Sequence, residues 1–386
     1  DVTNPDQISV LWEFSHSELG NVLGKTQVMR LNDGEWAVAV GNGYNSTNDE
    51  AVLFLINAET GSLIKRIATG AKGSNGLAGV GGWDEPLDGN FDYLYAGDLL
   101  GNLWKFDLTG GSVGGWGIPN KGGKLFSAKD SGGVAQPITA PPTIGSHPLT
   151  GEKWVFFGTG RYISSGDPSV TAMQTWYGLR DVSVSISGRG DLVERKIVQE
   201  GSSNSGAYRV FSATGDSVGG EAILSINADG SLNYLKQGWY IDLVLSGTPA
   251  LGERMISRNT LLSDILIGQS LVPSGDACTA GATGWVMAID PWLGGRLTDN
   301  FFDLNGDKKV DNSDNVIGAA GSPVEGKTLA SGGISIGNGG VPNVQAAGDD
   351  VVSLTGSPVD GGPLDSVVGK SSVLRGRLSW KEFVEQ

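Results

Sequence analysis

The sequence predicts an all-β fold, and more specifically a modified β-propeller, from three observations. Glycine accounts for 62 of the 386 residues, roughly twice its usual share, which indicates many tight turns. Short runs of β-branched and aromatic residues end at Gly, Asn or Asp, as strands do. A strand–turn–strand unit also recurs along the chain, and this is typical of propeller blades.

The predicted strands are short, and a turn residue follows each of them. They cover residues 36–40, 52–56, 93–97, 102–106, 154–157 and 285–289. Helix is expected to be almost absent, with at most a turn or two at 194–197 and 380–385.

The recurring unit is a strand, an Asp or Asn, and a short turn that ends in Gly. Residues 53–61, 103–110 and 286–294 share it, and residues 176–181 are a weaker copy. Asp or Asn accepts hydrogen bonds from the turn backbone, and Gly supplies a positive φ. Asn57 and Asp107 lie 50 residues apart, near the length of one blade. Later spacings are longer, so later blades are expected to carry insertions.

Residues 1–386 are expected to form one propeller domain with two interruptions. Residues 184–237 look like an embellished blade or an inserted hairpin. Residues 298–370 are rich in Gly, Asp, Ser and Asn and predict a loop-rich excursion before a closing segment at 374–383. Long loops in compact domains are usually functional or disordered. The chain starts at Asp1 without Met, so we interpret it as part of a longer protein.

Composition argues against several functions. A net charge of −15 disfavours binding to nucleic acid or anionic lipid. No apolar run is long enough to predict a membrane span. A single cysteine, Cys278, allows no disulfide within the chain, and with only two histidines a Cys/His zinc site is essentially excluded.

His16 and His147 lie near no nucleophile motif, so we expect both to face solvent and the protein not to be an enzyme.

One segment, DLNGDKKVD at 303–311, carries a specific motif. Oxygen-bearing side chains stand at positions 1, 3, 5 and 9, and position 7 offers a backbone carbonyl, as in an EF-hand calcium loop. Lys308 replaces the Gly of position 6, Asp314 replaces the Glu of position 12, and flanking helices are not evident. The loop is thus EF-hand-like only, and an acidic turn without metal is the alternative. The predicted Ca²⁺ ligands are Asp303, Asn305, Asp307, the carbonyl of Lys309, and Asp311.

Two other motifs are weaker. Gly41–Gly43 and Gly158–Gly160 follow strands, but no helix follows them, so we interpret them as turns at blade edges instead of phosphate loops. Arg189-Gly190-Asp191 spells the integrin-binding tripeptide, but so short a match is more simply a polar hairpin tip.

A series of motifs runs in order along nearly the whole chain: DVTNP at 1–5, LWEF at 11–14, GNGYN at 41–45, YAGD at 95–98, GNLW at 101–104, FGTGRY at 157–162, GWY at 238–240, GER at 252–254 and RGRLSW at 375–380. With them the chain resembles the C-terminal β-propeller domain of the PilY/PilC family, the type IV pilus biogenesis factors and tip-associated adhesins. The resemblance implies quinoprotein-like blades and one Ca²⁺ in the nine-residue loop. It also implies that the first blade and the family's N-terminal region precede residue 1. The integrin tripeptide of some members lies elsewhere in the domain, so Arg189–Asp191 inherits no role from it.

The same resemblance implies a function. The family supports pilus extension against retraction under calcium control, twitching motility and surface attachment. The implied partners are minor pilins, other pilus components, and a ligand on host cells or abiotic surfaces. The implied location is the cell surface or pilus tip of a Gram-negative bacterium, associated with the outer membrane or secreted. Two alternatives stay open: a quinoprotein-type propeller dehydrogenase, against which the single cysteine counts, and a glycan-binding lectin.

Overall fold

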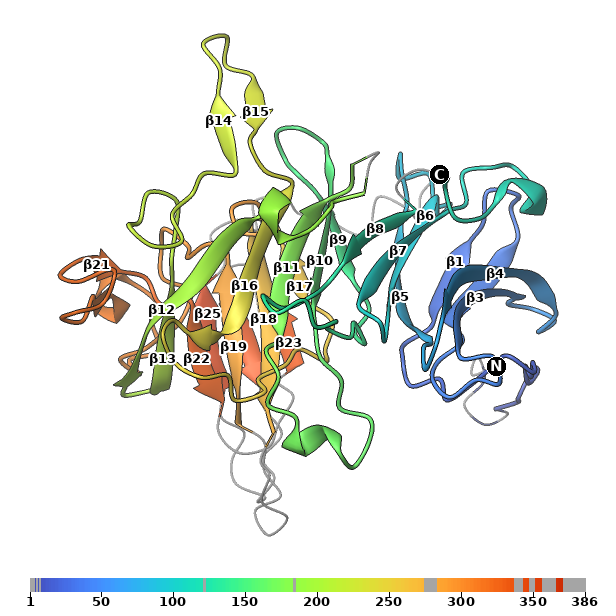
Figure 1. Cartoon of the computed structure of the whole chain (residues 1–386), viewed down its shortest axis with the longest axis horizontal. Helices are drawn as coiled ribbons and strands as arrows, with labels where there is room; N and C mark the ends of the chain where they lie inside the picture. The colour runs from blue at the N-terminus through green and yellow to red at the C-terminus, as the bar shows by residue number, and fades with distance from the viewer. Residues whose placement is uncertain are drawn as a thin grey trace.

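The structure is a computed structural model, and it confirms the all-β prediction (Figure 1). It describes residues 4, 6, 8–120, 123–182, 185–273, 283–336, 343–346, 351–355 and 366–370. Helix in this part is limited to four single 3₁₀ turns: η1 (Val113–Gly115), η2 (Asp167–Ser169), η3 (Arg189–Asp191) and η4 (Asn312–Asp314). None of these described helices is long and apolar enough to cross a membrane. Cys278 and the segments 374–383 and 380–385 lie outside the described residues.

Two four-stranded antiparallel sheets form the N-terminal part and have the up-and-down order of propeller blades. The first contains β1 (Gln27–Arg30), β2 (Trp36–Gly41), β3 (Glu50–Asn57) and β4 (Leu63–Lys72). The second contains β5 (Leu77–Trp83), β6 (Tyr93–Asp98), β7 (Asn102–Asp107) and β8 (Lys124–Ser127). The four strands predicted in this part are confirmed.

A ten-stranded sheet forms the centre, in the order β17-β18-β19-β22-β13-β12-β16-β11-β10-β9. All its neighbours are antiparallel except β12 and β16. Its strands are β9 (Thr143–Ser146), β10 (Lys153–Gly158), β11 (Thr175–Arg180), β12 (Val193–Ser203), β13 (Gly206–Phe211), β16 (Gly238–Leu245), β17 (Thr260–Leu262), β18 (Ile265–Val272), β19 (Thr283–Ile289) and β22 (Gly333–Ile336). The strands predicted at 154–157 and 285–289 are confirmed.

The expectation of a helical turn at 194–197 is wrong. These residues belong to β12, where burial alternates along Val193, Glu194, Arg195, Lys196 and Ile197. Val193 and Ile197 enter the core, and Arg195 is also buried. A period of two with an apolar face is the pattern of a strand.

Three small sheets complete the described strands (Figure 1). The hairpin of β14 (Leu224–Ile226) and β15 (Leu232–Tyr234) projects from the body, as expected for an insertion within 184–237. The excursion after residue 298 holds β20 (Val316–Ile317) with β21 (Thr328–Leu329), then β23 (Asn343–Ala346), β24 (Val351–Thr355) and β25 (Ser366–Lys370).

The hydrogen bonds of the recurring turn predicted from the sequence are confirmed, and Gly61 and Gly294 have the expected positive φ, whereas Gly110 does not. The Asn57 carboxamide oxygen accepts from the backbone of Glu59 and Thr60. The Asp107 carboxylate accepts from the Thr109 backbone, and Asp290 accepts from two N–H groups at 2.8 Å. Each of these side chains therefore closes its own turn.

Successive sheets pack face to face around apolar clusters. Leu53 of the first sheet shares a cluster with Phe106 of the second, and Tyr95 of the second shares another with Val155. A further cluster buries Phe301, Phe302 and other residues of the excursion against the central sheet. The segment before the acidic loop is therefore fixed in the core.

Candidate metal centre

The acidic loop curls around its first carboxylate. Asp303 is only 6% exposed, and its two oxygens accept from the backbone N–H groups of Gly306 (2.7 Å) and Lys308 (2.8 Å). Asn305 and Asp307 each accept from the N–H two residues further on, at 2.8 Å. Every second side chain thus turns back onto the loop backbone, as Asx turns do.

The backbone of the loop includes two left-handed residues. Gly306 has φ of 79° and Lys308 has φ of 69°. Position 6 of an EF-hand loop is normally Gly because the chain turns sharply there. Lys308 therefore adopts the conformation for which glycine is normally used, at a cost of roughly 1–2 kcal/mol. The sequence departs from the EF-hand at this position, whereas the backbone does not.

Asp314, at position 12, has a different task from the bidentate Glu of an EF-hand. Its side chain is buried, and one oxygen accepts from the backbone of Leu304 (2.8 Å) and Asn305 (3.2 Å). The other oxygen accepts from the backbone of Asp311 (2.9 Å). Together with the Asp311 side chain it forms a capping box on η4. Asp314 thus clamps the two ends of the loop together, a role that its spacing alone did not reveal.

The five predicted ligands fit calcium in donor chemistry, because carboxylate, carboxamide and carbonyl oxygens are what this cation takes. They also lie in one continuous loop whose turns match the EF-hand pattern. Among the described residues, however, no three acidic, histidine or cysteine side chains gather closely enough to hold a metal ion. Calcium binding by Asp303, Asn305, Asp307, Lys309 and Asp311 therefore stays a prediction.

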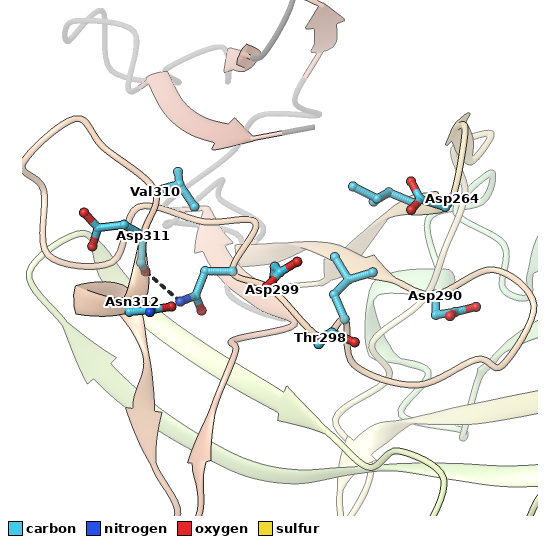
Figure 2. A pocket seen from close by; sticks show the side chains of 10 residues that line it. Asp264, Asp290, Thr298, Asp299, Val310, Asp311 and Asn312 are labelled. Atoms are coloured by element: carbon cyan, nitrogen blue, oxygen red, sulfur yellow. Dashed lines mark hydrogen bonds between the residues drawn. The ribbon is translucent and has the colours of Figure 1, made fainter. Parts of the chain in front are cut away.

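A cavity of about 460 Å³ lies beside the loop (Figure 2). Asp311 and Asn312 line it together with Asp264, Asp290 and Asp299. On its rim the Asn300 amide donates to the Asp311 carbonyl at 2.8 Å, marked by the dashed line in Figure 2. Burial raises the pKa of the Asp290 carboxyl, although the backbone N–H groups of Leu293 and Trp292 oppose the shift. The loop therefore faces a strongly acidic surrounding.

The expectation that both histidines face solvent is wrong. His147 is buried, its Nδ1 accepts from the Leu149 backbone (3.2 Å), and its ring meets Trp292 edge-on at 5.0 Å. Burial lowers the pKa of His147, and the positive charge of Arg180 adds to this effect. His16 is half-buried, with its ring 4.8 Å from that of Phe54. The packing indicates structural roles for both rings.

The tripeptide Arg189-Gly190-Asp191 is the 3₁₀ turn η3 instead of a hairpin tip. The Arg189 guanidinium makes two hydrogen bonds of 2.9 Å to the Asp242 carboxylate and lies over the Tyr240 ring. Asp191 accepts from the backbone and hydroxyl of Ser187. Gly190 is exposed, but both charged side chains of the tripeptide are engaged by neighbouring residues of the same chain.

Comparisons with known proteins agree with this architecture. The family model of the PilY1 beta-propeller domain matches residues 4–205. A type IV pilus biogenesis factor PilY1 homolog of Xylella fastidiosa is 36% identical over 390 residues, which cover all of this chain and 28% of the relative. The type IV pilus biogenesis factor PilY1 of Pseudomonas aeruginosa PAO1 is 34% identical over 413 residues, covering 99% of this chain and 34% of that protein.

A solved structure extends the comparison to three dimensions. The crystal structure of the Pseudomonas aeruginosa PilY1 C-terminal domain matches with a TM-score of 0.81 at 29% identity, over 96% of this chain and 77% of that one. The chain spans about a third of the length of the two curated relatives named above. From the family model and this shared fold, the chain belongs to the PilY1 β-propeller family.

Proposed function

We propose that this chain is the propeller part of a type IV pilus biogenesis factor that works without catalysis at the cell surface or pilus tip of a Gram-negative bacterium. The observation that carries the proposal is the match to the PilY1 C-terminal domain over 96% of the chain. Relatives that bear the name of pilus biogenesis factors, at 34–36% identity, support it. Minor pilins and other pilus components are the partners.

The proposed function includes one Ca²⁺, held by Asp303, Asn305, Asp307, the Lys309 carbonyl and Asp311. The donor types, the left-handed Lys308 and the Asx turns support this assignment. When bound, the ion would neutralise three carboxylates that otherwise repel one another. Burial of Phe302 and the hydrogen bonds to Asp314 hold the loop ends through contacts within the protein. The ion would therefore order the ligand side chains and leave the propeller unchanged.

Calcium occupancy then sets the balance of pilus extension against retraction, and with it twitching motility and surface attachment. A pilus component that contacts only the ordered loop makes extracellular Ca²⁺ the switch. The alternative within this proposal is a permanent calcium staple, which is occupied at all ambient concentrations. The dissociation constant distinguishes the two.

Titration calorimetry on chelated protein tests the ion. We expect one Ca²⁺ per chain, and at least tenfold weaker binding by Asp307→Ala and Asp311→Ala, since each change removes a ligand and a charge. Asp229→Ala, at the exposed tip of the β14–β15 hairpin, is the matched control and should bind as the parent does. Absence of heat from the parent protein would exclude the site.

Genetic complementation tests the pilus function. The full-length gene should restore piliation and twitching to a deletion strain, whereas the Asp307→Ala/Asp311→Ala version should not support normal twitching. Normal piliation and twitching by the neutralised version would exclude the switch. Failure of the unaltered gene to restore pili would contradict the pilus role itself.

A further inference from the structure

A second cavity, of about 310 Å³, lies between the turn of the β12–β13 hairpin on one side and the acidic loop with the segment that follows it on the other. Its lining comes from both: Ser202, Ser203, Asn204 and Tyr208 from the hairpin, and Leu304, Asn305, Ser313, Asp314, Asn315 and Val316 from the loop side. We refer to it as the hairpin groove. Its size is at the lower end of the range of small-molecule sites.

The hairpin groove is polar and carries no available charge. Hydroxyl and carboxamide groups make up most of its lining. Asp314 is the single acidic residue among the described lining residues, and both oxygens of that carboxylate accept from backbone N–H groups. None of the described residues that line the groove is a lysine, arginine or histidine. The groove therefore favours neither kind of ion. An anion would have no positively charged partner in it, and a cation would bind better in the neighbouring cavity, which is far more acidic.

Internal hydrogen bonds hold the two walls in place. The Asn204 amide donates to the Asn305 carbonyl (3.1 Å), and the Asn305 amide donates to the Ser313 hydroxyl (2.7 Å). The Asn300 amide donates to the Asn315 carboxamide oxygen (3.0 Å). These bonds fix the orientation of three carboxamides and leave the Asn204 oxygen and the Asn315 amino group able to bond a ligand. Ser203, on the same face of the hairpin as Tyr208, adds a hydroxyl that donates to the Gly206 carbonyl at 2.8 Å and can still accept a hydrogen bond.

An aromatic ring completes the groove. Tyr208 pairs across the hairpin with Gly201, where a Cβ would lie 2.5 Å from the tyrosine ring, so glycine leaves the room that this ring needs. The Tyr208 oxygen accepts from the Gln199 amide at 3.2 Å, which leaves its own proton for donation. Tyr208 thus offers an apolar surface with a polar tip.

We propose that the hairpin groove binds one sugar unit of a neutral saccharide. A sugar ring has many hydroxyls, each of which both donates and accepts, and it has apolar C–H faces. The groove offers the matching set: amide donors, carboxamide and hydroxyl acceptors, and one aromatic ring, without net charge. The site goes beyond the proposed pilus function and requires no metal ion.

Nuclear magnetic resonance on ¹⁵N-labelled protein tests this, with the methyl glycosides of glucose, galactose, mannose and N-acetylglucosamine as separate probes at up to tens of millimolar. At least one probe should shift the amide signals of 202–208 and 313–316 in a saturable manner. The Asn204→Ala/Asn315→Ala variant should bind that probe at least fivefold more weakly. Tyr162→Ala, which removes an exposed tyrosine outside the groove, should bind as the parent does.

A blocking variant keeps the test independent of fold stability. Asn204 is exposed in the hairpin turn and lines the groove, so Asn204→Trp places an indole at the groove without removing a core contact and should abolish the shifts. The proposal is overturned if none of the four glycosides shifts these signals. It is equally overturned if Asn204→Trp binds the glycoside as well as the parent protein does.

Discussion

At the scale of single residues, buried polar side chains at strand ends connect one sheet to the next. Asn42 follows β2 and is fully buried; its carboxamide oxygen accepts from the backbone of Val52 and Leu77, each at 3.0 Å. Its amide donates to the Glu50 carbonyl at 2.8 Å. Since Val52 belongs to the first sheet and Leu77 to the second, the Gly41–Gly43 motif is a junction between blades.

Asn42→Ala should therefore destabilise the protein by about 2–4 kcal/mol, because it leaves several buried backbone groups without partners. Asn227→Ala removes an exposed carboxamide at the tip of the β14–β15 hairpin and should change stability by less than about 0.5 kcal/mol. Guanidinium denaturation followed by tryptophan fluorescence measures both. Equal midpoints for the two variants would contradict the junction role.

Asp216 should make the free energy of unfolding depend on pH in the acidic range. Burial alone would raise its pKa, but hydrogen bonds from Arg296, Lys327 and the Ala213 backbone lower it to about 2. A carboxyl whose folded pKa lies below the ordinary 3.8 stabilises the fold above that pH. This contribution, on the order of 2 kcal/mol, should be lost as the pH falls from about 4 to about 2.

Thermal melting across that pH range measures the effect. Asp216→Asn should melt lower than the parent at neutral pH, and the gap should shrink as the pH falls towards 2. Asp33→Asn, at an exposed position, should follow the parent curve. A gap that stays constant with pH would rule out the ionised carboxylate as its cause.

At the scale of elements, the loop-rich excursion is attached to the central sheet at several points. Gln199 of β12 donates to the Ile317 carbonyl (3.2 Å) and accepts from the Ala319 backbone (2.7 Å). Lys327 reaches the Asp216 carboxylate at 2.8 Å. The acidic loop therefore lies between two anchored segments, with Phe301 and Phe302 buried on one side and Val316 on the other.

Asp314 should matter for calcium binding although it is not a predicted ligand. Asp314→Asn keeps the shape but places an amino group where one carboxylate oxygen now accepts from backbone N–H groups. We expect calcium affinity to fall at least fivefold. Without the clamp the loop is less ordered before the ion binds, so part of the binding free energy is used to order it. Asp229→Asn is the matched control, and the readout is calorimetry. An unchanged dissociation constant for Asp314→Asn would contradict the clamp.

Local elements were predictable from the sequence, whereas long-range pairings were not. The strand at 36–40 and the Asx turn at Asn57 follow from residues that adjoin one another. The parallel pairing of β12 with β16 joins residues that are 46 to 48 positions apart, such as Val193 with Trp239, and no local signal predicts it; this pairing places 194–197 in a sheet. The burial of His147 depends on Trp292, and the role of Asp314 depends on backbone groups up to ten residues away. Such features emerge only from tertiary packing.

At the scale of the whole molecule, the sheets approach closely at glycines near strand ends. A Cβ at Gly41 of β2 would lie 2.2 Å from the Ala78 carbonyl oxygen of β5. A Cβ at Gly97 of β6 would lie 2.2 Å from Ile138, and one at Gly158 of β10 would lie 2.2 Å from Met255. Gly41 and Gly97 lie in the second strands of the two four-stranded sheets, and Gly158 lies in the strand next to the β9 edge of the central sheet. The glycine-rich composition thus serves close packing between sheets as well as turns.

Gly41→Ala should therefore separate the first two sheets. The neighbouring atoms are backbone carbonyls, which cannot move aside as a flexible side chain does, so the expected cost lies at the upper end of the roughly 1–3 kcal/mol that overpacking produces. Gly111→Ala is the matched control, because a Cβ there meets no atom within 4 Å and φ is not positive. Its denaturation midpoint should equal or slightly exceed that of the parent, since alanine restricts the unfolded chain. Gly41→Ala should lower the midpoint clearly, and coincident midpoints for the two variants would show that the blades do not depend on close approach at this glycine.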